Sequence, residues 1–372
     1  MLYDVVIVGA GPAGSAAARL LAEAGWSVAL VEKSEFPRPK VCGEFISATS
    51  MAVLEACGVA VPFIAAAGPA VTRVGVYAGN AMLSAPREQV WGRALGREHL
   101  DVMLRDAALA AGARLFQPVE VISIRREAND YLCTLEDGYE LSARVVIAAC
   151  GSWNAKGVFA LPAAAPKSSD LFAFKAHFRQ SGLPAGLMPL LAFPGGYGGL
   201  VQTDAGRTSL SCCIRRDALT RARQRHGGKA AGAVLAHILE TTRGARLALE
   251  QATLEGHFLS TGPIRPGIRP RQDDRVYFTG NVAGEAHPVI AEGISMAIQS
   301  SGLLAELLIA HRGERYALEW KRRFAPRIRA AGVFAQLAMR APTRAASLGL
   351  LRAVPGLIGL GARLSGKVPI ST

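Results

Sequence analysis

Residues 3–32 read YDVVIVGAGPAGSAAARLLAEAGWSVALVE, and this stretch decides the fold. The apolar run from Val5 to Val8 predicts a strand that is buried on both faces of a sheet. Gly9, Gly11 and Gly14 follow in GxGxxG spacing. In such a motif the first glycine permits a tight turn, the second lets the backbone approach a pyrophosphate, and the third lets the helix pack closely on the strand. This order predicts a dinucleotide site.

The second half of the stretch supports the same site. Small residues after Pro12 predict a helix pressed on the sheet, and its N-terminus would offer free N–H groups to phosphates. A second strand ends at Glu32, whose carboxylate can accept hydrogen bonds from an adenosine ribose. An acid here argues against a bound 2′-phosphate, and so against NADP, but does not separate FAD from NAD. The candidate residues are Gly9, Ala10, Gly11, Pro12, Ala13, Gly14, Glu32 and Lys33.

The composition is that of a globular protein, because 50% of the 372 residues are hydrophobic and 19% are charged. The length predicts two structural domains, or one domain with a large insertion. The first strand follows Met1 almost at once, which predicts no signal peptide. The six cysteines lack metal-ligand spacing, so free thiols in a cytoplasmic protein, and no metal site, are expected.

The net charge of +13 is concentrated at one end of the chain. Between Trp320 and Thr372 there is no Asp or Glu and there are ten Lys and Arg residues. No nucleic-acid motif accompanies them, so no nucleic-acid partner is expected. Residues 345–362 are apolar but interrupted by Arg352 and Pro355, too short for the roughly 20-residue span of a membrane helix. This tail is either packed on the protein or forms a peripheral surface that contacts a membrane.

The remaining elements suggest two sheets. The middle of the chain lacks the alternation of strands and helices that parallel sheets require, so we expect a separate antiparallel sheet there. A glycine-rich turn is expected over 193–199. We predict helices over 47–57, 97–111, 229–250 and 293–311, and strands over 71–77, 115–124, 131–135, 145–149, 171–178, 209–214 and 275–280.

Four segments together resemble the FAD-dependent oxidoreductases that include p-hydroxybenzoate hydroxylase, the flavin-dependent halogenases and the geranylgeranyl reductases. The resemblance extends to about residue 325. The segments are the glycine motif with Glu32, the Pro39–Glu44 loop PKVCGE, the Arg97–Asp101 run REHLD, and Val276–Gly284 (VYFTGNVAG) followed by Pro288 and Glu292-Gly293-Ile294.

The resemblance implies an α/β fold with a Rossmann-like FAD-binding domain of the glutathione reductase type, formed by residues 1–70, 93–160 and 271–325. A substrate domain built on an antiparallel sheet (71–92 and 161–270) would be inserted into it, and a helical tail would cover 326–372. Arg97 would contact the flavin's ribityl or phosphate region, and Val121 would also bind the cofactor. Gly280 and Asn281 would meet the ribityl chain and pyrophosphate, and the amides of Gly293 and Ile294 would face the isoalloxazine.

The chain departs from the family pattern at informative positions. Asn281 and Cys150 stand where the family usually has Asp. The WxWxIP motif of the halogenases is absent, which argues against halogenation. Residues 194–199 match the start of the reductase motif PxxYxWxFP, with Gly199 in place of its tryptophan. This difference weakens the lipid-reductase interpretation without removing it.

We therefore predict an FAD-dependent oxidoreductase with NADPH or NADH as a transient electron donor. A monooxygenase acting on a hydrophobic or aromatic small molecule is the first interpretation. A double-bond reductase acting on an isoprenoid or other lipid is the second, and a flavin-binding redox module without turnover is the third.

Several candidate residues have a structural alternative. Cys42 is a proton donor or substrate contact, or merely part of a tight turn. His287 is an acid or base, or makes a structural hydrogen bond. Tyr197 lines the substrate pocket, or packs at a strand end. Arg38 and Lys40 attract an acidic ligand, or lie in a solvated loop.

Overall fold

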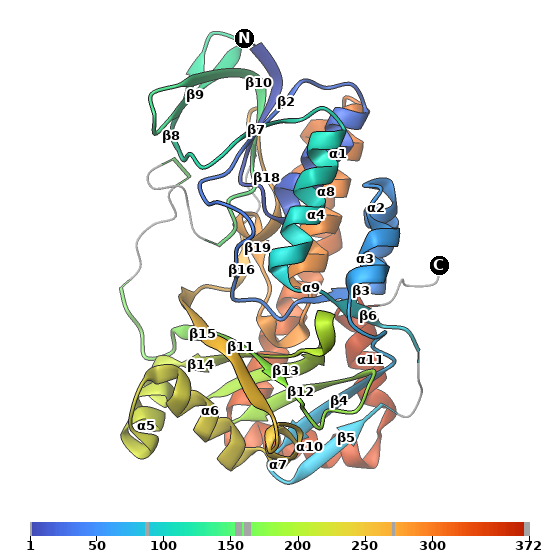
Figure 1. Cartoon of the computed structure of the whole chain (residues 1–372), viewed down its shortest axis with the longest axis vertical. Coiled ribbons are helices and arrows are strands. Elements are labelled where there is room, and N and C mark those ends of the chain that lie inside the picture. The colour runs from blue at the N-terminus through green and yellow to red at the C-terminus, as the bar shows by residue number, and fades with distance from the viewer. Residues whose placement is uncertain (1, 86–88, 153–157, 160–164, 270–271, 368–372) are drawn as a thin grey trace.

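The computed structural model describes residues 2–85, 89–152, 158–159, 165–269 and 272–367, and is built around two sheets (Figure 1). One sheet, near the N-terminus in the view, includes the strand that leads into the glycine motif, and the other lies at the opposite end of the molecule. Long helices run beside the first sheet toward the second. The predicted fold class, an FAD-binding type of α/β domain joined to an antiparallel sheet, is confirmed.

The first sheet has a parallel core in the order β18-β10-β1-β2-β7. Residues Val5 to Val8 in β1 are buried, as expected for the central strand of a sheet covered on both faces. A hairpin, β8–β9, pairs antiparallel with the first half of β10. The strands are β1 (Leu2–Val8), β2 (Val28–Val31), β7 (Arg114–Phe116), β8 (Val121–Glu127), β9 (Asp130–Leu135), β10 (Glu140–Ala148), β17 (Gln272–Asp273) and β18 (Val276–Phe278).

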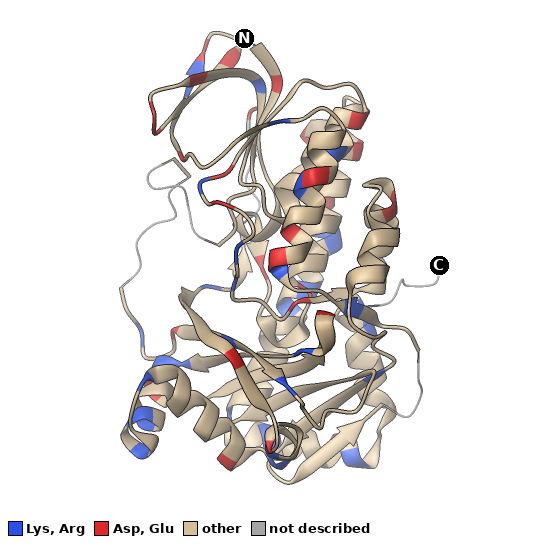
Figure 2. Ribbon diagram, in the orientation of Figure 1, with Lys and Arg blue, Asp and Glu red and all other residues tan. Residues whose placement is uncertain are grey.

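Three helices pack together beside this sheet: α1 (Pro12–Glu23), α4 (Arg97–Ala110) and α8 (Gly293–Ile309). Helix α1 lies so close to β1 that a Cβ on Gly14 would come within 1.8 Å of the Gly9 carbonyl oxygen. Gly9 itself has φ +106°, a backbone conformation that side chains disfavour. The first and third glycines of the motif are therefore needed for the fold itself. Helix α4, beside α1, carries both acidic and basic residues along its length (Figure 2).

The second sheet has seven strands in the order β15-β11-β14-β13-β12-β4-β5, and only the β12–β4 pair is parallel. Cys212 and Cys213 point to opposite faces of this sheet, as neighbours in a strand should, and belong to different apolar clusters. The strands are β4 (Arg73–Ala78), β5 (Ala81–Ser84), β11 (Leu171–Arg179), β12 (Leu187–Phe193), β13 (Gly196–Gln202), β14 (Thr208–Arg215) and β15 (Thr253–Ile264).

Shorter elements connect the sheets and cover their edges. Two small ribbons pair antiparallel, β3 with β6 and β16 with β19. The remaining elements before the tail are β3 (Phe45–Ser47), α2 (Met51–Ala56), α3 (Ala60–Ala66), β6 (Gly92–Ala94), α5 (Arg216–His226), α6 (Ala230–Thr241), α7 (Arg243–Leu249), β16 (Gly267–Ile268) and β19 (Gly284–Glu285).

Three sequence predictions needed correction. The glycine-rich segment is a turn only at Pro194 and Gly195, because β13 begins at Gly196, where any side chain would strike the Phe193 ring. The predicted strand 115–124 is two strands, β7 and β8, which pair with different partners. The predicted helix 229–250 is interrupted at Thr242, which has extended backbone angles.

The predicted boundary at residue 325 falls inside a single helix, α9 (Tyr316–Met339). One face of α9 is continuously buried, and this packing maintains the helix through Pro326 despite the hydrogen bond that proline removes. The buried residues, spaced three or four apart, are Tyr316, Trp320, Phe324, Ile328, Ala331, Ala335 and Met339. The tail continues as α10 (Ala341–Ala353) and α11 (Gly356–Leu364).

Candidate functional site

A cavity of about 530 Å³ lies between the two sheets. Residues of both sheets line it, together with the Pro39–Glu44 loop and the start of α8. The predicted site residues found among its described lining residues are Gly9, Gly11, Pro12, Ala13, Glu32, Lys33, Cys42, Arg97, Val121, Tyr197, Gly280, Asn281, Gly293 and Ile294. Ala10, Gly14 and His287 are not among those lining residues.

The glycine motif and Glu32 form one end of the cavity. The Ala10 N–H donates to Glu32 Oε2 at 2.9 Å, and the Ser34 N–H donates to Glu32 Oε1 at 2.9 Å. The buried carboxylate is thus held at the end of β2, beside the first turn of α1. A Cβ built on Gly11 would meet only the Arg97 guanidinium, at 3.8 Å, so the space above this backbone is open. This cradle suits a pyrophosphate with a ribose beside it.

Besides Lys33, the basic residues Arg38, Lys40 and Arg97 line the cavity. Arg38 Nη2 lies 3.1 Å from Glu32 Oε2, while its buried Nε has no partner among the described residues. Burial, with the neighbouring positive charges of Arg38 and Arg97, lowers the pKa of Lys40 to about 8. An anion in this part of the cavity would relieve that repulsion. The residues therefore fit the diphosphate of FAD.

Helix α4 positions Arg97 through Asp101, one turn along. The guanidinium donates twice to that carboxylate, at 2.6 Å from Nε and 2.8 Å from Nη2. Burial alone would lower the pKa of Arg97, but the paired Asp101 raises it more strongly. Arg97 is thus a fixed positive charge beside the glycine turn.

The neighbours of Asn281 account for an amide at this position, where the family usually has Asp. Its amide Nδ2 lies 3.0 Å from Ser152 Oγ and 3.4 Å from Glu285 Oε1. Burial raises the pKa of the Glu285 carboxyl, which lines the cavity. A second carboxylate at position 281 would face this buried acid, whereas an amide can donate to it. The substitution is therefore compensated locally by Glu285.

The N-terminus of α8 forms the next section of wall. Gly293 and Ile294 line the cavity there, where a helix of 17 residues presents its positive dipole end. The preceding residue, Glu292, is fully buried, with Oε1 2.9 Å from Lys367 Nζ and Oε2 3.1 Å from Ser47 Oγ. These contacts fix the start of the helix. Amides in this position can stabilise negative charge on a bound ring system.

The three residues with uncertain roles lie in different settings. Cys42 lines the cavity and interacts with the Arg97 guanidinium, so both interpretations of this thiol stay open. The Tyr197 hydroxyl is 3.1 Å from His287 Nδ1, and burial lowers the pKa of that histidine to about 4. His287 thus lies behind Tyr197 as a neutral support, rather than on the described cavity wall.

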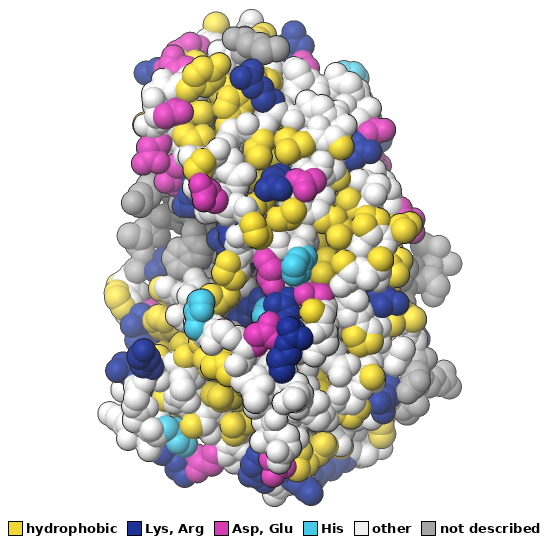
Figure 3. All heavy atoms as spheres, in the orientation of Figure 1, with side chains coloured by type: hydrophobic (Ala, Val, Ile, Leu, Met, Phe, Trp, Pro, Cys, Tyr) yellow, Lys and Arg dark blue, Asp and Glu magenta, His cyan; other side chains and the backbone are white. Residues whose placement is uncertain are grey.

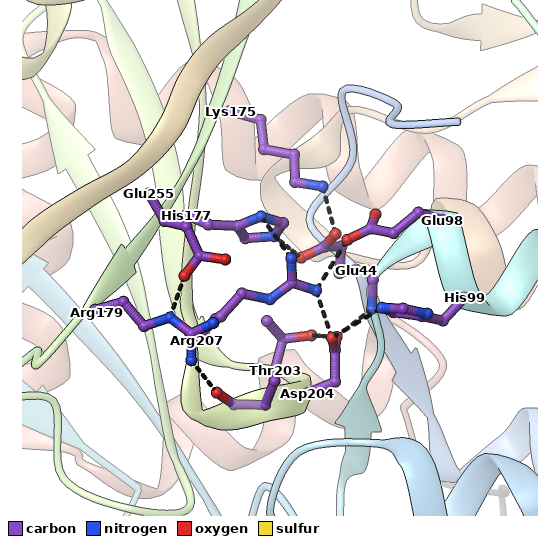
Figure 4. A network of polar contacts seen from close by, with 12 residues as sticks. Glu44, Glu98, His99, Lys175, His177, Arg179, Thr203, Asp204, Arg207 and Glu255 are labelled. Carbon is purple, nitrogen blue, oxygen red and sulfur yellow. Dashed lines mark hydrogen bonds and ion pairs between the residues drawn. The ribbon is translucent and has the colours of Figure 1, made fainter. Parts of the chain in front are cut away.

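A network of charged residues beside the cavity had no signal in the sequence (Figure 4). Glu44, fully buried, pairs with Lys175 and, at 2.8 Å, with His177 Nε2. His177 Nδ1 in turn lies 3.3 Å from an Arg207 nitrogen. Arg207 also contacts Glu98 at 2.9 Å and pairs with Asp204. Its members come from the Pro39–Glu44 loop, from α4, from β11 and from the connection between β13 and β14, so only the fold brings them together.

The network ties the cavity loop to the second sheet. Burial by itself would raise the pKa of the Glu44 carboxyl. The hydrogen bond from His177 and the charge of Lys175 outweigh this effect and lower the pKa to about 2. His99, half exposed, lies 3.4 Å from Asp204 at the outer end. Charged and histidine side chains gather in the middle of this face (Figure 3). The cations already present neutralise the carboxylates that a metal ion would need.

Comparison with known proteins supports an FAD-binding domain in the first part of the chain. Residues 2–165 match the family model of an FAD binding domain. The resemblance to FAD-dependent oxidoreductases that the sequence predicts is confirmed by this match and by the proteins that follow.

Three curated relatives each match about two fifths of the chain. The menaquinone reductase of Mycobacterium tuberculosis is 32% identical over 158 residues, 41% of this chain and 39% of that protein. The digeranylgeranylglycerophospholipid reductase 2 of Methanopyrus kandleri is 36% identical over 163 residues, 41% and 38% of the two chains. The rifampicin monooxygenase of Rhodococcus hoagii is 31% identical over 153 residues, which are 40% of this chain and 32% of that protein. In these matches the chain spans less than two fifths of each relative's length.

Solved structures match the fold over almost the whole chain. The flavin-dependent brominase Bmp2 superposes with a TM-score of 0.78 and 20% identity, covering 99% of this chain and 94% of the brominase. PqsL, described as a probable FAD-dependent monooxygenase from Pseudomonas aeruginosa, superposes with a TM-score of 0.73 and 17% identity. The match covers 98% of this chain and 99% of PqsL. At these identities the likeness establishes the fold, including the second sheet.

Substitution of Gly11 tests the cradle. We expect Gly11→Val to fold normally, because the added side chain meets open space, but to bind FAD about 100-fold more weakly, because it occupies the pyrophosphate position. The measurements are the thermal midpoint of the apoprotein and FAD titration by fluorescence quenching. Gly14→Ala is the matched comparison: its methyl group would strike the Gly9 carbonyl, so it should lower the midpoint. Normal FAD affinity in Gly11→Val would contradict this site.

The pKa of Lys40 predicts a pH effect on cofactor binding. The protonated amine attracts the diphosphate, so FAD affinity should fall as pH rises above about 8, by up to about tenfold per unit. Lys40→Met should bind FAD more weakly at pH 7 and lose this dependence. Isothermal titration across pH 7 to 9.5 measures both effects, with Lys229→Met, an exposed lysine between α5 and α6 that does not line the cavity, as the control. A slope that persists in Lys40→Met would assign the titration to another group.

The Glu44 carboxyl should make the free energy of unfolding depend on pH in the acidic range. Its pKa falls from an ordinary 4.5 to about 2, so its contribution is complete above pH 4.5 and is lost as pH falls toward 2. A shift of this size corresponds to about 3 kcal/mol. Glu44→Gln should lose a similar amount at pH 7, because Lys175 stays buried without its carboxylate. Urea unfolding measures this loss, and Glu140→Gln, which removes an exposed ion pair, should change stability little.

Proposed function

We propose that this protein is an FAD-dependent monooxygenase that uses NADPH or NADH and acts on an uncharged hydrophobic or aromatic small molecule. One observation carries the proposal: every described residue that the second sheet contributes to the cavity is uncharged. These residues are Ala173, Met188, Leu190, Tyr197, Gly198, Gly199, Leu200, Val201, Ser211, Cys212, Cys213, Leu259, Ser260, Thr261 and Ile264. The charged lining residues all lie outside the strands of that sheet.

The cavity wall next to the first sheet would bind the cofactor, and the wall formed by the second sheet would bind the substrate. Arg38, Lys40 and Arg97 would hold the diphosphate, and the amides of Gly293 and Ile294 would face the ring system. Bound FAD supplies hydride acceptance from the nicotinamide and reaction with O₂. The uncharged wall then binds the substrate and excludes water from the space next to the ring. Residues such as Leu190 and Leu200 would thus select the substrate by shape and apolar contact.

A double-bond reductase is the second candidate, favoured by the position of Cys42. This thiol lies on the cavity wall next to Arg97, where a proton donor to a reduced substrate would be useful. The names of two of the three relatives, a menaquinone reductase and a digeranylgeranylglycerophospholipid reductase, accord with this chemistry. Both candidates share the cofactor site and the uncharged wall, and they differ in the fate of oxygen.

The deciding experiment follows oxygen and hydride together. The FAD-loaded protein is reduced without oxygen by NADPH or NADH, and ¹⁸O₂ is then admitted with uncharged aromatic compounds or with isoprenoid quinones. We expect faster flavin reduction or reoxidation with a productive compound, and one ¹⁸O atom in the product by mass spectrometry. Gly11→Val provides the control with little bound flavin.

Two results would overturn the proposal in different ways. A product that gains two hydrogen atoms under anaerobic conditions, with no ¹⁸O, would establish the reductase instead. In that case Cys42→Ser should slow product formation while flavin reduction by the nicotinamide stays unchanged. A protein that binds no FAD would contradict both candidates.

A further inference from the structure

We propose that α10 and α11 form a docking surface for an anionic lipid bilayer. This inference concerns where the protein works and does not depend on the reaction proposed above. The two helices lie at the end of the molecule formed by the second sheet, where α10 contacts β5 and α11 contacts β4 (Figure 1). Helix α10 buries none of its 13 residues.

The outward side of this helix pair is apolar. Leu350, Val354, Leu360 and Leu364 are 48–60% exposed, although large aliphatic side chains are normally covered. By length and composition together the two helices reach the hydrophobicity of a membrane span, but the chain bends by 116° between them. No single described helix is long and apolar enough to cross a membrane. A bent amphipathic pair of this kind suits the plane of the interface.

The charge of the surface selects the partner. Residues 320–372 contain no acid, and Arg340, Arg352 and Arg363 are exposed on or beside the two helices. No described carboxylate pairs with any of these three arginines. A second copy of the same face would bring like charges together, which disfavours a symmetric dimer through this surface. Anionic lipid headgroups would instead match the arginines while the acyl region accepts the leucines.

A basic cleft of about 250 Å³ adjoins the start of α10. Arg215, Arg221 and Arg344 line it together with one acid, Asp217, which lies 3.0 Å from Arg215 and 3.6 Å from Arg221. Among its described hydrogen bonds, the Arg344 guanidinium donates only to a backbone carbonyl, that of Ala338. Positive charge therefore exceeds negative charge here, and a lipid phosphate group has the complementary charge.

The inward side of the same helices touches the wall of the cavity. Ile358 of α11 is buried in one apolar cluster with Phe45, Met188 and Val201, and these three residues line the cavity. The segment after α11 is held as well, since the Thr49 hydroxyl donates to the Gly366 carbonyl at 2.8 Å and Lys367 pairs with Glu292. The docking surface is thus held rigidly against the substrate wall, so a bound bilayer would lie next to that wall.

Vesicle co-sedimentation tests the proposal with the FAD-loaded full chain. The probes are vesicles of phosphatidylcholine alone and of phosphatidylcholine with phosphatidylglycerol, at low and high salt. We expect binding to the anionic vesicles that weakens as salt rises. The variant Leu350→Gln/Leu360→Gln/Leu364→Gln should bind about tenfold or more weakly, and Arg352→Gln/Arg363→Gln should bind about tenfold more weakly and lose most of the salt dependence.

Matched controls alter exposed residues elsewhere. Ile122→Gln/Leu247→Gln/Leu318→Gln removes aliphatic side chains of similar exposure, and Arg125→Gln/Arg126→Gln removes two exposed charges on β8. These variants should bind like the original protein. Absence of binding to anionic vesicles, or equal loss in the controls, would overturn the proposal. A dimer in light scattering that the leucine variant dissociates, without vesicle binding, would assign the face to self-association instead.

Discussion

The close contact between α1 and β1 is the constraint on which the rest of the structure depends. Gly14 permits it, because any side chain there would overlap the Gly9 carbonyl. The contact directs the N-terminus of α1 at the end of the parallel sheet, where Glu32 and Arg97 converge. A helix shifted outward by even the size of a methyl group would open this cradle. The same packing therefore makes the domain stable and makes its cofactor site.

Charge is distributed unevenly around the cavity, and the distribution has a physical logic. The wall formed by the first domain carries Arg38, Lys40 and Arg97, which repel one another until an anion is present. The opposite wall, from the second sheet, contributes no charged residue among those described. Between the two walls, the charge of the Glu44 carboxylate is balanced by Lys175 and His177. Glu44 has a φ of +62°, a backbone conformation that favours glycine. Those ion pairs hold the Pro39–Glu44 loop against the second sheet.

Much of the candidate site could be brought together from the sequence because its signal is local. The glycines, Glu32, Arg97 and the Gly293-Ile294 pair lie in short motifs whose backbone geometry follows from residue type and spacing. Other features had no such signal. His287 lies two residues from Glu285 in the sequence, yet it supports Tyr197 from behind while Glu285 lines the cavity. Residues so close in sequence could be separated only by knowing how the chain turns after β19.

The chain alone was enough to establish the dinucleotide fold, the position of its glycine cradle and the basic, acid-free tail. Those properties depend on neighbours in sequence: a turn, a helix start, a count of charges. Tertiary structure decided that Asn281 is compensated by Glu285, that Glu44 meets Lys175 across 131 positions, and that α9 continues through Pro326. These outcomes depend on burial and on contacts between distant segments. Such contacts form only when both sheets have packed, so no local pattern could encode them.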